Sequence, residues 1–244
     1  MKQRFSTGVP DGWKVTVRPK AGEAVMVACQ RPRAERAPKG DGDPERARLE
    51  AERRARQSIR RTVAEFCLTR MVTLTYAESR GPESRPVVVA ELEAFVRKLR
   101  RELRGLVWVA VLEWHPSGHG WHIHVLVNRF VPKARWAELW GHGFVDVRLI
   151  KAKGNTSSRK ATLKAANYAA KYIGKDRPEG APERKSGEHR YHRPHWLVFE
   201  VIRSEGSPEE LRAIIAHFLP SISWTWASWE CEDWRGPQCV VFRE

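Results

Sequence analysis

Alternating hydrophobic and polar positions predict a β-strand at residues 121–128. His122 and His124 fall on one side of this stretch, whereas the odd-numbered positions from Trp121 to Val127 are all bulky and apolar. A period of two residues with many β-branched side chains is typical of a strand that packs one face against a core. The opposite face of the same strand therefore carries two imidazoles.

The same periodicities predict the rest of an α+β domain. Alternation predicts strands at 70–76, 106–115 and 144–150, and apolar residues three and four apart predict helices at 88–103 and 133–140. The order strand, helix, strand, strand, helix, strand is that of a ferredoxin-like or RRM-like βαββαβ core with an antiparallel β-sheet. In this fold the first and third strands are central and both helices cover one face, so we expect the histidine face to be the open one.

Further elements precede this core. Alternation predicts an N-terminal hairpin at 13–17 and 24–29, and Asp43 followed by Pro44 predicts the start of a basic helix that continues over 47–66. We expect an N-terminal hairpin and basic helix, the core, and a C-terminal extension that completes or packs on the core. The predicted boundaries of these three parts are 1–65, 66–176 and 177–244.

The C-terminal part holds a third helix and an extension. Helical spacing predicts a helix at 157–174, polar residues predict a mobile loop at 176–194, and alternation predicts a strand at 196–202. Ser207-Pro208-Glu209-Glu210 is typical of a capping box and predicts a helix that ends at Phe218.

The hairpin formed by two neighbouring strands decides where Glu113 points. A four-residue loop at 116–119, which is rich in turn-forming residues, sets Glu113 opposite His122 and Val111 opposite His124. A slip of one residue would bury the Glu113 carboxylate among the apolar side chains of the other face, which is costly. We therefore predict that Glu113, His122 and His124 are three metal ligands on one face.

Two imidazoles and one carboxylate with open positions suit a divalent ion that also accepts a substrate oxygen. The predicted metal is Mg²⁺ or Mn²⁺, with Zn²⁺, Co²⁺ or Fe²⁺ able to substitute. Two other histidines are rival ligands. His115 lies on the face of Glu113 and could substitute or add, whereas the position of His119 in the turn favours a solvated side chain.

The chain is strongly basic. A formal net charge of +15 and a pI of about 10.1 favour a polyanionic partner. Residues 31–61 hold eleven Lys/Arg against six Asp/Glu, and residues 151–176 hold seven against one. Each stretch is either a solvated helix face or a surface that contacts phosphates. The predicted nucleic-acid-binding residues are Arg53, Arg56, Arg60, Lys160 and Lys164.

Two tyrosines share one face of the predicted third helix. Tyr168 and Tyr172 are four residues apart, and Lys171 and Lys175 follow each of them by three. Tyrosines that pack on a sheet would explain this spacing, but a basic helix with paired phenols beside an open metal face favours phosphodiester chemistry. A phenol has a pKa of about 10 and needs a nearby cation to ionise. We therefore predict that the tyrosines are nucleophiles and that the lysines assist them or hold phosphate.

Several classes of protein are disfavoured. The sequence has no apolar run of about 18 residues and no apolar N-terminal signal core, so we expect a cytoplasmic protein without a membrane segment. It has no glycine-rich loop that ends in Gly-Lys-Ser/Thr, and hence encodes no ATPase motor.

Cysteines and tryptophans give weaker signals. The four cysteines form no Cys-x-x-Cys pair and are interpreted as reduced structural thiols. Four tryptophans crowd the tail, where core or interface packing is favoured over stacking on single-stranded nucleic acid. These residues are Cys29, Cys67, Cys231 and Cys239, and Trp224, Trp226, Trp229 and Trp234.

Three ordered motifs resemble those of the HUH endonucleases, specifically the rolling-circle replication initiators of small plasmids and phages. The motifs are Val-Thr-Leu-Thr at 72–75, Glu113 followed by His122-Ile123-His124, and Tyr-Ala-Ala-Lys-Tyr-Ile-Gly-Lys at 168–175. The resemblance covers about residues 45–195 and implies the HUH endonuclease fold. It also implies metal-dependent nicking of one strand of origin DNA, a 5′-phosphotyrosine link and a free 3′-hydroxyl that primes synthesis.

The resemblance assigns roles to the two tyrosines. Tyr172 matches the nucleophile of members with one active tyrosine, and Tyr168 matches the partner that takes the second strand transfer in two-tyrosine members. Motif order favours an initiator over a conjugative relaxase. Because no helicase domain is present, the resemblance implies a host helicase, and a host polymerase to extend the primer.

Three alternatives stay open at this point. A transposase or relaxase-type strand transferase would use the same chemistry. A non-catalytic, initiator-like DNA-binding protein would use only the basic helices and the tail tryptophans. A non-haem iron oxygenase also uses two histidines and one carboxylate, although the paired tyrosines and the charge of +15 disfavour it.

Overall fold

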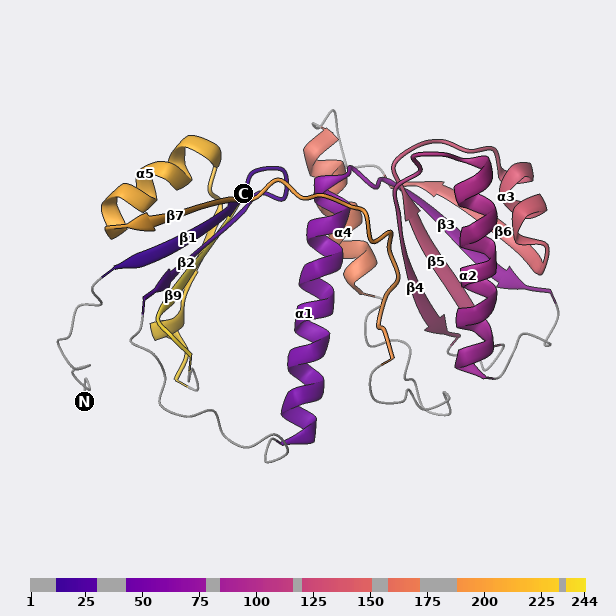
Figure 1. The fold of residues 1–244 in the computed structure, drawn as a ribbon, viewed down its shortest axis with the longest axis horizontal. Coiled ribbons are helices and arrows are strands. Elements are labelled where there is room, and N and C mark those ends of the chain that lie inside the picture. The colour runs from indigo at the N-terminus through magenta and orange to yellow at the C-terminus, as the bar shows by residue number, and fades with distance from the viewer. Residues whose placement is uncertain are drawn as a thin grey trace. The chain divides into compact units, whose positions relative to one another are not determined.

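The computed structural model divides the chain into two compact units. One comprises Met1–Asp41 and Val198–Glu244, and the other comprises Gly42–Leu197. Figure 1 shows the elements of both units along the chain. The residues that the structure describes are 12–29, 43–77, 84–115, 120–150, 158–171, 188–232 and 236–244.

The Gly42–Leu197 unit is built on a four-stranded antiparallel sheet. Its strands lie in the order β4 (Trp108–Trp114), β5 (Trp121–Val127), β3 (Arg70–Tyr76) and β6 (Gly143–Leu149). The first and third strands of the βαββαβ sequence are therefore central, as predicted from the order of elements. The predicted α+β fold class with a ferredoxin-like core is confirmed.

Two helices cover the face of this sheet that lies opposite to the histidines. They are α2 (Arg85–Glu102) and α3 (Lys133–Trp140), and each turns its apolar stripe toward the strands. Trp121, Ile123 and Val125 of β5 are buried in the resulting core, as their alternation predicted. This core fixes the plane of β5, and with it the side on which the imidazoles emerge.

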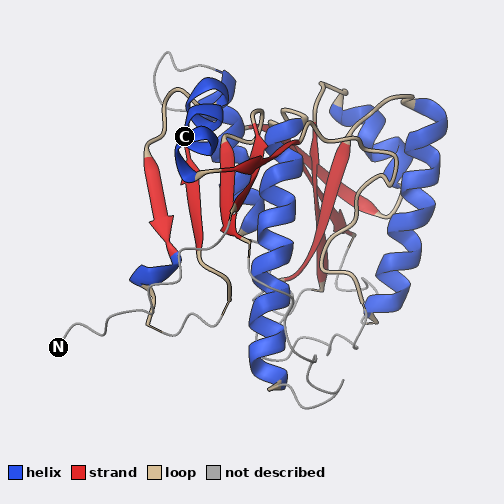
Figure 2. Cartoon of the chain, turned by 60° about the vertical axis from the view of Figure 1, so that its left-hand side comes forward, coloured by secondary structure: helices blue, strands red, loops and turns tan. Residues whose placement is uncertain are grey.

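The histidine face is only partly open, which corrects the sequence-based expectation. The helices α1 (Pro44–Glu65) and α4 (Ser158–Ala170) pack over part of it, with Val111 and Leu126 buried between helices and sheet. In Figure 2 the strands of this sheet run between α1 and α2. The reason is that this face also carries apolar side chains, which must be removed from water.

Among the described residues, the ends of the helices in this unit lie close to their predicted positions, except that α4 ends before the predicted residue 174. Asp43 caps α1, because its Oδ1 accepts a hydrogen bond from the amide of Glu45 at 3.0 Å, and Pro44 follows at the first helical position. Helix α4 runs to Ala170. Tyr172 and Lys175 lie outside the described residues.

Residues 188–193 run along the free edge of β4, and we call them the β4-edge segment. The amide and carbonyl of His192 exchange hydrogen bonds of 2.8 Å with Ala110. The side chains of Arg190, Tyr191 and Arg193 bond to helix α1. The prediction of a mobile loop over 176–194 is therefore wrong for this segment, since its polar side chains have partners; 176–187 lie outside the described residues.

The other unit is a five-stranded antiparallel sheet made from both ends of the chain. Helix α5 (Pro208–Phe218) packs on one of its faces through Leu211 and Ile215. The capping box of Ser207 and Glu210 and the predicted end of the helix are confirmed. The strands lie in the order β7 (Ile202–Gly206), β1 (Trp13–Arg18), β2 (Glu23–Ala28), β9 (Cys239–Arg243) and β8 (Trp224–Ala227), and β8 continues into the 3₁₀ helix η2 (Ser228–Glu230).

This arrangement groups the elements differently from the predicted parts 1–65, 66–176 and 177–244. The N-terminal hairpin β1–β2 pairs with β7 and β9, so it shares a core with the C-terminal strands, while α1 packs on α4. Alternation cannot reveal these pairings because they join residues distant in sequence. The strand predicted at 196–202 is also wrong, since 196–201 are not in a strand and β7 begins at Ile202.

The four cysteines are free thiols, which agrees with the absence of a Cys-x-x-Cys pair. Only Cys239 is buried, and Cys67 and Cys231 are exposed, so the structural role expected for all four does not fit those two. Among the described residues, no helix is both long enough and apolar enough to cross a membrane.

Candidate active site

The β4–β5 hairpin has the predicted register. Glu113 lies opposite His122 and Val111 lies opposite His124, so the carboxylate and both imidazoles share one face of the sheet. The amide of His115 bonds to the carbonyl of Gly120 at 2.9 Å, which closes the hairpin around the loop. The alternation of β5 and the length of the loop were sufficient to predict this geometry.

Glu113 and His124 form a close polar pair. The Nε2 atom of His124 lies 2.6 Å from Oε2 of Glu113, and His124 and Glu113 are only 5% and 8% exposed. A carboxylate and an imidazole at this depth must be paired to offset the loss of hydration. The pair therefore holds both side chains in one orientation on the sheet.

Two threonines of the central strand β3 orient the imidazoles. Thr73 and Thr75 lie opposite His124 and His122, and their Oγ1 atoms lie 3.2 and 3.5 Å from the Nδ1 atoms of these histidines. A hydrogen bond at one ring nitrogen sets the ring plane and directs coordination to the other nitrogen. Both threonines belong to the first of the three sequence motifs, but the role of each in orienting a histidine was not predicted.

The donor set fits a divalent ion, although the side chains are not gathered around one point. Within the described part of the chain, no group of three or more His, Cys, Asp or Glu side chains is arranged as a metal site. Glu113, His122 and His124 nevertheless share one face, and an ion bound at Nε2 of His124 would take the place of its polar contact with Glu113. The assignment of these three ligands stays a prediction.

The alternative histidines differ in what the structure describes. The ring of His115 stacks on that of His122 with centroids 4.8 Å apart, so His115 lies beside the predicted ligands as expected. His119 lies outside the described residues. His115 thus remains an alternative or additional ligand.

Helix α4 brings one of the two tyrosines to the histidine face. Tyr168 packs against the apolar cluster that includes Val111, the strand neighbour of His124. The Nζ atom of Lys171 lies 5.9 Å from the centroid of the Tyr168 ring, which places a cation beside this phenol. The structure therefore brings Tyr168 of α4 and Lys171, which directly follows α4, together where the helix packs on part of the histidine face.

The predicted nucleic-acid-binding residues lie on two helices that pack together. Arg53 and Arg56 are exposed and Arg60 is half-buried on α1, and Lys164 is exposed on α4. Arg56 also forms an ion pair of 3.7 Å with Glu52, so part of its charge is neutralised within the helix. Lys160 is part of α4, but its side chain lies outside the description.

Two residues of the edge strand β6 were not predicted as site residues. Phe144 lies opposite Thr75 and Asp146 lies opposite Thr73, so both share the face of the histidines. Their alternation was visible in the predicted strand 144–150, but the pairing of β6 with β3 joins distant parts of the chain. The predicted topology puts this strand at the edge beside the first strand of the core, but periodicity could not set the register that brings Phe144 and Asp146 opposite Thr75 and Thr73.

Comparison with known proteins gives one family match. Residues 69–177 match the model of a family of replication-associated proteins of the ORF2 type. This range includes Glu113, His122, His124 and both tyrosines. Neither the curated proteins nor the solved structures gave a significant match.

The family match confirms the predicted resemblance to replication initiators over the segment that carries all three motifs. Assignment to the HUH superfamily, tyrosine chemistry and metal dependence stay predictions. From β3 to the segment after α4, the chain is similar to the ORF2-type family of replication-associated proteins.

Proposed function

We propose that this protein is a sequence-specific, single-strand DNA endonuclease and strand transferase that initiates rolling-circle replication at an origin. The observation that carries the proposal is the shared sheet face of Glu113, His122 and His124, with Tyr168 packed over the same face. The family match over 69–177 supports the replication role. A host helicase and a host polymerase are the proposed partners, together with single-stranded origin DNA.

Glu113, His122 and His124 would hold the divalent ion, with Mg²⁺ or Mn²⁺ proposed and Zn²⁺ or Co²⁺ as substitutes. Such an ion supplies Lewis-acid polarisation of the scissile phosphate. Thr73 and Thr75 keep the imidazole rings directed by their bonds to Nδ1.

The covalent step is a transesterification. The phenolic oxygen of Tyr172 attacks the phosphorus, the bond from phosphorus to the 3′-oxygen breaks, and the phenolic proton ends on the released 3′-hydroxyl. The enzyme keeps the 5′-phosphate as a phosphotyrosine ester. Lys171 and Lys175 stabilise the ionised phenol or neutralise the charge of the phosphate. Tyr168 accepts the second DNA strand in a two-tyrosine cycle.

Labelled single-stranded origin DNA and Mn²⁺ test the nucleophile. We expect a detergent-resistant protein–DNA adduct with the wild-type protein and its loss in Tyr172→Phe, because the ring is kept and only the attacking oxygen is removed. Tyr168→Phe is the matched control and should retain the first adduct. An adduct that persists in both variants and in the double variant would defeat the assignment.

The proposed ligands are tested by separating cleavage from binding. Glu113→Gln and His124→Ala should each lower cleavage by at least about 100-fold, since each removes a ligand that polarises phosphate. Salt-sensitive DNA binding should remain, because it depends on surface cations. Equal loss of binding, with an unchanged Mn²⁺ requirement, would show a structural role for the pair instead.

A second candidate is an initiator-like DNA-binding protein without catalysis. The observation that favours it is that, among the described residues, three metal-binding side chains do not converge. This candidate predicts metal-independent, salt-steep DNA binding with no nick at any Mn²⁺ concentration. A related transposase would give the same adduct as the first proposal, and would differ by joining the strand to a second DNA site.

A further inference from the structure

We propose that Phe144 is a stacking platform for the base of a nucleotide next to the scissile phosphate. The ligand is the π-face of a base in single-stranded DNA. Phe144 lies on β6, outside the three sequence motifs, and would add a binding residue to them. The inference rests on the proposed function, because that function puts a single strand on the histidine face.

Phe144 lies in the same cross-strand row as the predicted ligands. Glu113 pairs with His122, His122 with Thr75, and Thr75 with Phe144. Neighbouring strands lie about 4.8 Å apart, so Phe144 is about 10 Å from His122 along this row. Single-stranded DNA that crosses the imidazoles toward the β6 edge of the sheet would therefore reach the phenyl ring of Phe144 next.

The phenyl ring of Phe144 is exposed to solvent and is not part of the hydrophobic core. Phe144 is 69% exposed, whereas Val145, its neighbour on the other side of β6, is buried in the core with α2 and α3. A large apolar side chain gains nothing for folding in this position. It gains from contact with a flat, weakly hydrated surface, and nucleic-acid bases stack on aromatic side chains in this way.

The backbone beneath the ring is held in place. A Cβ atom on Gly143 would lie 2.2 Å from the amide nitrogen of Ala77, so only glycine allows β6 to approach β3 here. Gly143 also has φ of 151°, a value that other residues rarely adopt. Trp140 donates from Nε1 to the carbonyl of Thr75 at 3.2 Å, which ties the end of α3 to the same point. Phe144 therefore projects from a fixed backbone.

The unit that carries this face is strongly basic, which favours a polyanionic occupant. The Gly42–Leu197 unit holds 31 Lys/Arg against 17 Asp/Glu in its sequence, a net charge of +14. Farther along β6 on the same face, Arg148 pairs with Asp146 at 2.5 Å, and both side chains are at least half exposed. An ion pair this exposed is weak and can be exchanged for a phosphate contact. The occupant favoured by these charges is a nucleic acid.

Stacking is tested without cleavage, on metal-free protein. The probe is a short oligothymidylate that carries a single 2-aminopurine, whose fluorescence falls when the base stacks. We expect wild-type protein to quench the probe, and Phe144→Ala to lose most of the quenching and bind about tenfold more weakly. Phe144→Trp should restore both, and Phe144→Leu, which is apolar but not flat, should not.

Phe130→Ala is the matched control. Phe130 is 66% exposed, close to the value for Phe144, but lies in the connection between β5 and α3. Its loss should leave quenching and affinity unchanged. The inference is overturned if Phe144→Ala or Phe144→Leu behaves as wild type, or if the control weakens binding equally. A wild-type protein that stacks the probe but forms no adduct with Mn²⁺ would refute only the proposed function.

Discussion

At the scale of single residues, burial and neighbouring charge lower the pKa of His192, a histidine outside the candidate site. His192 sits in the β4-edge segment, where burial, followed by the positive charges of Arg85 and His189, lowers its pKa from 6.5 to about 4. Arg85 is itself only 2% exposed and donates a hydrogen bond to the carbonyl of His189 at 2.9 Å. Protonation of His192 would therefore place a second cation beside a buried guanidinium.

This lowered pKa makes stability depend on pH in a defined direction. Below pH 6.5 the unfolded chain binds a proton at His192, while the folded chain does not until about pH 4, so acidification destabilises the fold across that window. The expected loss is on the order of 3 kcal/mol. Denaturant unfolding as a function of pH should show this loss in wild type and its absence in His192→Leu.

His195, which is exposed in the same stretch, supplies the control for this measurement. His195→Leu should keep the wild-type pH dependence, because it leaves His192 and its neighbours Arg85 and His189 in place. Identical pH profiles for wild type and His192→Leu would contradict the assignment.

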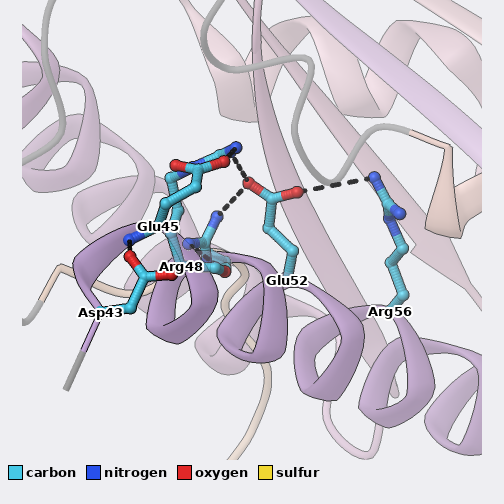
Figure 3. Close-up of polar contacts among 6 residues, drawn as sticks. Asp43, Glu45, Arg48, Glu52 and Arg56 are labelled. Carbon is cyan, nitrogen blue, oxygen red and sulfur yellow. Dashed lines mark hydrogen bonds and ion pairs between the residues drawn. The ribbon is translucent and has the colours of Figure 1, made fainter. Parts of the chain in front are cut away.

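At the scale of elements, Glu52 joins the β4-edge segment to helix α1. Its buried carboxylate accepts hydrogen bonds from Arg48 at 2.7 Å and Arg190 at 3.2 Å, and it lies 3.7 Å from Arg56 (Figure 3). The segment in turn covers β4, an edge strand whose unpaired backbone groups would otherwise be open to pairing. Glu52 thus contributes the buried ion pair among the contacts that hold this segment against α1 and β4.

Removal of the Glu52 charge should release this segment. Glu52→Gln leaves three guanidinium groups without their shared carboxylate, and the loss of a buried partner costs about 3–5 kcal/mol. Hydrogen–deuterium exchange should rise at the amide of His192, which bonds to Ala110. Glu50→Gln is the control, because the ion pairs of Glu50 within the described part of the chain, with Arg46 and Arg54 on the same helix, are exposed. Equal destabilisation by both substitutions would contradict this role of Glu52.

At the scale of the whole molecule, charge is divided unequally between the two units. The unit of Met1–Asp41 and Val198–Glu244 holds 13 Lys/Arg against 12 Asp/Glu in sequence, so the Gly42–Leu197 unit carries +14 of the +15. Each unit has a hydrophobic core of its own. Electrostatic binding of DNA is therefore expected to depend on the Gly42–Leu197 unit.

Destabilisation of the near-neutral unit should leave DNA binding in place. Ile215 of α5 is buried in the core of the five-stranded sheet, and Ile215→Ala should cost about 2–5 kcal/mol in that unit. Exchange should rise in β1 and β2, while affinity for single-stranded DNA and its salt dependence stay within about twofold of wild type. Parallel loss of binding would show that the positive unit depends on the other one.

Periodicity predicted the helices and strands of the βαββαβ core better than it predicted which elements outside this core pack or pair together. The alternation of β5 and a short loop were enough for the pairing of Glu113 with His122. The burial of the face around Val111 and Leu126 by α1 and α4 was not predicted, nor was the pairing of β1 with β7. Polar composition likewise predicted a mobile loop around Arg190, but the ion pair of Arg190 with Glu52 joins this segment to α1.

The sequence by itself determined the local periods, the helix caps, the hairpin register and the order of the motifs, because each depends on residues near one another in the chain. Only the tertiary structure decided that Thr73 and Thr75 bond to the histidines, that Phe144 lies in their row, and that the N-terminal strands share a core with the C-terminal ones. These features follow from contacts between distant segments, where packing and hydrogen-bond satisfaction of the whole chain select the partner.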